Sequence, residues 1–103
     1  MDATEQLQRL YQAGFELETF ERYPQAVGVV RDNVVALMQA TVRGLVMVGA
    51  PGWRMGEVMG VLVEREGHQV FQCKDQTVEA TPERLEAYQR FREDLETALA
   101  AQQ

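Results

Sequence analysis

The residues best suited to form a binding site lie in a glycine-rich segment, residues 49–57, with the sequence GAPGWRMGE. Glycines let a ligand approach the backbone, Trp53 offers a flat stacking surface, and Arg54 and Glu57 offer opposite charges. The segment is not a phosphate loop, because such loops precede a helix and carry Lys with Ser or Thr. Glycine and proline mainly mark turns, so the favoured interpretation is a tight turn with Trp53 folded over the core and Arg54 paired with an acid.

His68 is the only histidine and could serve as a general acid or base. It directly follows a Glu66-Gly67 turn, where exposed polar residues are common, so a surface position is expected. An enzyme would need His68, Glu57 and Arg54 to meet in one groove, and this is the alternative to a binding function. No residue is assigned a catalytic role.

Metal and cofactor sites are not expected from this sequence. Cys73 is the single cysteine, and no cluster of histidine, cysteine or acidic residues has the spacing of a ligand set. Cys73 has only Lys74 and His68 as basic neighbours in the sequence, so it is expected to be a buried small hydrophobe rather than a nucleophile.

The composition indicates an ordinary globular protein. The 103 residues are 46% hydrophobic and 25% charged, which predicts one domain spanning residues 1–103. Sixteen acidic against ten basic residues give a net charge of −6, which disfavours nucleic acid as a partner. No apolar run approaches membrane-spanning length and no basic-then-apolar leader is present, so a cytoplasmic location without membrane contact is expected.

The two ends of the chain are expected to be helical. Residues 2–13 carry apolar side chains at helical spacing behind a possible Asp2 cap. Thr81, Pro82 and Glu83 form a typical helix start, and an apolar stripe follows over about four turns. Residues 15–23 alternate as a strand does but also continue the first helical stripe, and an edge strand is the preferred of these two interpretations.

Short strands are expected between the helices. Asp32-Asn33 predicts a two-residue hairpin turn that pairs Val30 with Val35 and Gly28 with Leu37. A second tight turn at residues 66–67 pairs Val63 with Val70 and Leu62 with Phe71. The remaining strands are expected at residues 45–48, 58–65, 68–73 and 77–80.

This order predicts an α+β fold: an N-terminal helix, a meander of about five to six short antiparallel strands, and a C-terminal amphipathic helix, with both helices on one sheet face. Both faces of the central hairpin are apolar, so curling of the sheet, a partner or a ligand must bury the second face. The favoured hypothesis is a binding or interaction module, acting as a homodimer across that uncovered face. Its groove near the Trp53 loop would accept a small ligand or a protein partner; a structural subunit of a larger acidic assembly is a third hypothesis.

Overall fold

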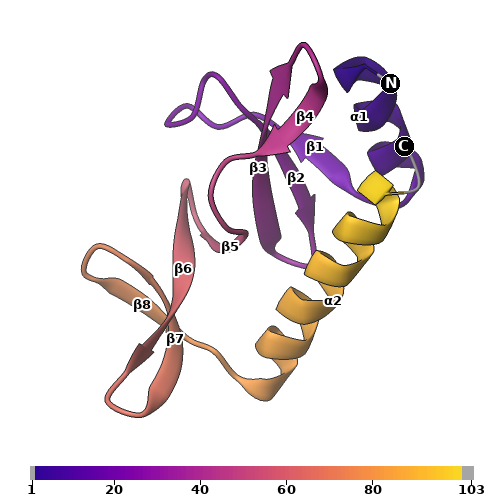
Figure 1. Cartoon of the computed structure of the whole chain (residues 1–103). Coiled ribbons are helices and arrows are strands. Elements are labelled where there is room, and N and C mark those ends of the chain that lie inside the picture. The colour runs from indigo at the N-terminus through magenta and orange to yellow at the C-terminus, as the bar shows by residue number, and fades with distance from the viewer. Residues whose placement is uncertain (1, 101–103) are drawn as a thin grey trace.

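Both predicted helices are present in the computed structural model, which describes residues 2–100 (Figure 1). Helix α1 (Ala3–Gln12) begins after Asp2, whose carboxylate accepts a hydrogen bond from the Glu5 backbone N–H at 2.8 Å. Helix α2 (Pro82–Ala100) begins after Thr81, whose hydroxyl accepts a hydrogen bond from the Arg84 backbone N–H at 3.3 Å. Both predicted helix starts are therefore confirmed.

The strands between the helices form one antiparallel sheet, so the α+β prediction is confirmed, although the strands of the described residues number eight rather than five or six. They are β1 (Glu16–Glu18), β2 (Val27–Arg31), β3 (Val34–Thr41), β4 (Gly44–Met47), β5 (Gly52–Met55), β6 (Val58–Arg65), β7 (His68–Cys73) and β8 (Gln76–Glu79). The strand order is β1-β2-β3-β5-β6-β7-β8, and β4 pairs with β3 beside β5.

The two predicted hairpins have the predicted registers. Val30 lies opposite Val35, and Asp32 and Asn33 between them have φ angles of 51° and 68°, the left-handed values that a two-residue turn requires. The hairpin of β6 and β7 likewise pairs the four residues predicted from its turn. The turn residues and the apolar alternation were sufficient to fix both registers.

Strand β5 is the main departure from the predicted elements, because the whole of residues 49–57 was expected to be a loop. Trp53 pairs with Val34 of β3 and with Gly60 of β6. A two-residue turn, Gly56-Glu57, with Gly56 at a φ of 68°, joins β5 to β6. The expected edge strand over residues 15–23 is also shorter than predicted: it lies at the sheet edge, but only Glu16–Glu18 pairs with β2.

Both helices cover one face of the sheet, as predicted, and α2 runs along the sheet from β8 back toward α1 (Figure 1). Phe91 and Leu95 of α2 are fully buried against this face, and the Phe15 and Phe91 rings meet edge to face at 5.4 Å. The core on this side contains Leu10, Phe15, Val29, Val34, Ala36, Met38, Phe71, Ala80, Tyr88, Phe91 and Leu95. Burial of these side chains is the main driving force that holds the helices on the sheet.

Over the central hairpin of β2 and β3 the second sheet face is covered by the chain itself, so burial of that hairpin does not require a homodimer across this face. Residues 19–26, which join β1 to β2, fold over this face and place Phe20 in a cluster with Val30, Val35 and Leu37. All four side chains are buried within the single chain. Gly28 makes room for this cover, since a Cβ at Gly28 would collide with the Phe20 ring.

Strands β6, β7 and β8 extend away from the rest of the sheet and give the molecule its elongated shape, 43 × 26 × 18 Å (Figure 1). Strand β6 pairs with β5 up to Gly60 and with β7 from Val61 onward. A Cβ at Gly60 would lie 2.5 Å from the Met55 sulfur and 3.1 Å from backbone atoms of Phe71 and Gln72, so any side chain here would force these neighbours to shift. The β6–β7 turn therefore lies far from the β5–β6 turn.

Candidate functional site

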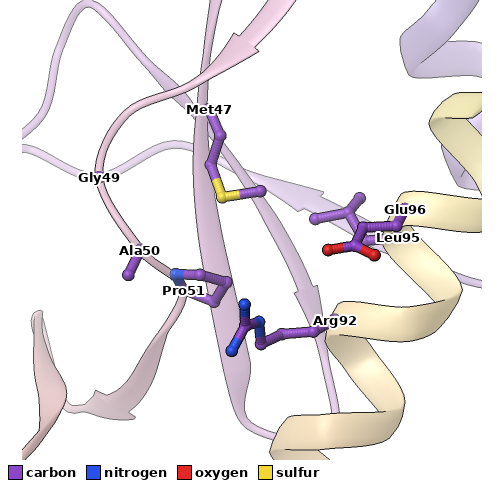
Figure 2. A pocket seen from close by; sticks show the side chains of 7 residues that line it. All are labelled: Met47, Gly49, Ala50, Pro51, Arg92, Leu95 and Glu96. Atoms are coloured by element: carbon purple, nitrogen blue, oxygen red, sulfur yellow. The ribbon is translucent and has the colours of Figure 1, made fainter.

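A cleft of about 290 Å³ lies between the loop that joins β4 to β5 and helix α2 (Figure 2). The first part of the glycine-rich segment forms one wall, and one turn of α2 forms the other. The lining residues are Met47, Gly49, Ala50, Pro51, Arg92, Leu95 and Glu96. The cleft therefore lies beside the part of this segment that precedes Trp53, and none of the four predicted site residues, Trp53, Arg54, Glu57 and His68, lines it.

The loop wall turns at Gly49 and is anchored to α2 at Pro51. Gly49 has a φ of 72°, which lets the chain turn away from β4 at a position where side chains are strained. At the other end, the Tyr88 hydroxyl of α2 donates a hydrogen bond to the Pro51 carbonyl at 3.2 Å, and both residues are buried. The cleft is thus a preformed feature of the fold, because a buried hydrogen bond ties its two walls together.

The cleft combines an apolar floor with a charged rim. Leu95 is fully buried at the floor, and Met47 reaches into the space from the end of β4. Arg92 and Glu96 lie one helical turn apart on the exposed side of α2, and the Arg92 guanidinium is 5.9 Å from the centre of the Tyr88 ring. Such a site suits a ligand that places an apolar group on the floor and its polar atoms at the solvent-facing rim.

Trp53 does not line the cleft. Its ring stacks on Phe71 with a centroid distance of 5.2 Å and an interplanar angle of 22°, and it packs against the core on the helix-covered face. The Arg84 guanidinium lies 6.0 Å from the ring centre. The interpretation that Trp53 folds back over the core is confirmed.

Arg54 points to the opposite sheet face from Trp53, since neighbouring strand residues alternate. Its guanidinium donates hydrogen bonds of 2.6 and 2.9 Å to the two carboxylate oxygens of Glu18, so the predicted pairing with an acid is confirmed. This hydrogen bonding raises the pKa of Arg54; burial partly opposes the effect, and the charges of Glu18, Glu57 and Glu16 add to it. Arg54 and Glu57 therefore lie within electrostatic reach of each other.

His68 lies apart from both of these residues. It is exposed, as expected, and pairs with Arg65 at the far end of β6, whereas Glu57 precedes Val58 at the near end. An extended strand rises about 3.3 Å per residue, so the seven residue steps from Val58 to Arg65 span roughly 23 Å. The three residues do not converge on one substrate, and the geometry gives the enzyme hypothesis no support.

A second, more polar cavity of about 300 Å³ lies at the β2–β3 turn and includes Arg31 and Arg54. Both guanidinium groups are already engaged: Arg31 forms a 2.7 Å ion pair with Asp94, and Arg54 binds Glu18. Within residues 2–100, no three His, Cys, Asp or Glu side chains are grouped closely enough to hold a metal ion. Neither helix of the described chain is long and apolar enough to cross a membrane.

The sequence did not identify the α2 wall of the cleft. Arg92 and Glu96 have the spacing of an ordinary solvated pair, and Leu95 belongs to a core stripe. Their position opposite residues 49–51 follows only from how α2 docks on the sheet. The one available signal was the glycine-rich segment itself, which sequence reasoning did identify.

No model of a known protein family matches this chain, and neither the curated proteins nor the solved structures contain a significant match. The geometry of the cleft is therefore the basis for a functional proposal.

Proposed function

We propose that this protein is a small cytoplasmic binding module whose ligand occupies the cleft between residues 49–51 and α2. The observation that carries the proposal is the pairing of an apolar floor with one basic and one acidic side chain at the rim. Ligand pockets typically begin at about 300 Å³, so a cleft of this size suits a ligand no larger than an amino acid.

The rim defines the chemistry of the ligand. A carboxylate on the ligand would lie near Arg92, an ammonium group near Glu96, and an apolar side chain would reach toward Leu95 and Met47. The favoured class is therefore a free apolar amino acid or the apolar terminal residue of a peptide. The Tyr88–Pro51 hydrogen bond supports binding without a large rearrangement, because it already fixes the distance between the two walls.

Titration with free leucine and phenylalanine, followed by backbone amide NMR shifts, tests this proposal. We expect the shifts to centre on Met47, Gly49 and Leu95, and Arg92→Gln to weaken binding by roughly fivefold through loss of its charged contact. Glu86→Gln and Arg90→Gln are matched controls, since they form an exposed pair at the same spacing on α2 and should not alter binding. Absence of shifts at about 10 mM ligand would overturn the proposal.

A further inference from the structure

Strand β4 has one unpaired edge. Among the described strands it hydrogen-bonds only to β3, and β5 occupies the other half of the same β3 edge. The far side of β4 therefore presents backbone donors and acceptors to its surroundings. Such an edge is a template for pairing with another strand.

The backbone directions along β4 are fixed by two hydrogen bonds. The Val48 N–H donates to the Leu37 carbonyl at 2.8 Å and so faces β3. The Leu45 N–H donates to the Gln6 side-chain oxygen of α1 at 2.7 Å and so faces away from β3. Directions alternate along an antiparallel strand, so the Met47 N–H and carbonyl also face away from β3. Helix α1 thus covers the start of this edge and leaves Met47 open.

The other outer edges of the sheet are protected by polar or charged residues. Strand β1 carries Glu16 and Glu18, and β8 carries Gln76, Thr77 and Glu79. Strand β4 carries no charge, and Val46 and Val48 on either side of Met47 are 46% and 45% exposed. Natural proteins usually place charges on free edges to prevent pairing, and this edge lacks that protection.

We propose that a second copy of this chain pairs with β4 in antiparallel orientation, about a two-fold axis at Met47. In this register the two Met47 residues exchange both outward backbone hydrogen bonds. Val46 of each copy then lies opposite Val48 of the other, and both valine pairs lie on the sheet face opposite α2 because their β3 neighbours are Gln39 and Leu37.

A second copy fits this edge for two reasons. The arrangement is self-complementary, since the donor and acceptor belong to one residue and the flanking valines are equivalent under a two-fold axis. The chain also carries a net charge of −6, and the uncharged segment Gly44–Met47 lets two copies meet without placing like charges opposite each other. The homodimer predicted from the sequence would therefore form through the β4 edge instead of across the second sheet face.

Sedimentation velocity from about 10 μM to 1 mM measures the association. We expect a monomer–dimer equilibrium, and we expect the Met47 amide to exchange with solvent more slowly as concentration rises, while the Leu45 amide does not change. Val46→Lys with Val48→Lys sets like charges opposite each other and should raise the dimer dissociation constant at least about tenfold. Val61→Lys, at a valine that is 52% exposed on β6, is the control and should have no effect.

A charge-swap experiment tests the register itself. Mixing the double lysine variant with a Val46→Glu, Val48→Glu chain should restore association, because each lysine then lies opposite a carboxylate. A strict monomer over the whole concentration range, or a dimer that the lysine variant leaves intact, would overturn the proposal. Val46 and Val48 are not cleft residues, so the lysine variant should bind leucine as the unmodified chain does, and the two proposals can fail separately.

Discussion

The Arg54 guanidinium holds the Glu18 carboxylate by two hydrogen bonds, across the two strands that lie between β5 and β1. The same guanidinium lies 5.5 Å from the centre of the Phe20 ring. Phe20 belongs to the segment that covers the second sheet face. This ion pair therefore links β1 at the sheet edge to β5 in the middle of the sheet. It also helps to hold residues 19–26 on the second sheet face.

The coupling between Arg54 and Glu18 can be measured by a double-mutant cycle with alanine at each position. We expect a coupling free energy of roughly 0.5–1 kcal/mol, because the geometry is bidentate but both side chains are about one-third exposed. The Arg90–Glu86 pair, whose side chains are 64% and 69% exposed, is the matched control and should give only a few tenths of a kcal/mol. Equal coupling for the two pairs would show that the strand-spanning contact has no special role.

Phe20→Ala tests whether residues 19–26 are an integral part of the core. Phe20 is 4% exposed and packs on Val30, Val35 and Leu37, so its truncation should lower the free energy of unfolding by about 3 kcal/mol. Urea denaturation measures this loss. Val42→Ala, at a fully exposed hairpin tip, is the control and should change stability little. A loss below about 1 kcal/mol for Phe20→Ala would mean that the cover contributes little to the fold.

Tyr88→Phe tests the tie between the cleft walls. The substitution removes the hydroxyl that donates to the buried Pro51 carbonyl, so stability should fall by about 1–2 kcal/mol. Hydrogen exchange at Gly49 and Ala50 should also become faster, since the loop loses its anchor on α2. Tyr11→Phe is the control, because Tyr11 lies exposed on α1. Unchanged loop exchange in the Tyr88 variant would argue against a fixed cleft wall.

Trp53→Ala separates a packing role from a binding role for this tryptophan. We expect a stability loss of about 2–4 kcal/mol from the lost stack on Phe71, measured by urea denaturation and circular dichroism. Trp53→Phe should recover much of the loss. Amino acid binding should persist in both variants because Trp53 does not line the cleft. Retained stability with lost binding would instead assign Trp53 to a ligand site.

Much of the fold could be predicted from local signals. The Asp32-Asn33 turn and the alternating valines beside it specified a register, and Thr81-Pro82-Glu83 specified a helix start. Strand β5 was missed because four residues are too few to show alternation, and because Gly52 and the glycines on either side of the strand resemble those of a loop. The packing of residues 19–26 over the second sheet face was missed because irregular segments carry no periodic pattern.

The sequence by itself determined the α+β class, both helix starts and two hairpin registers, because each depends on neighbours in the chain. Only the tertiary structure decided that Arg54 and Trp53 lie on opposite faces, that His68 lies a strand length from Glu57, and that α2 completes a cleft with residues 49–51. These relations depend on how distant segments pack, and packing is governed by side-chain burial over the whole core, which no local pattern specifies.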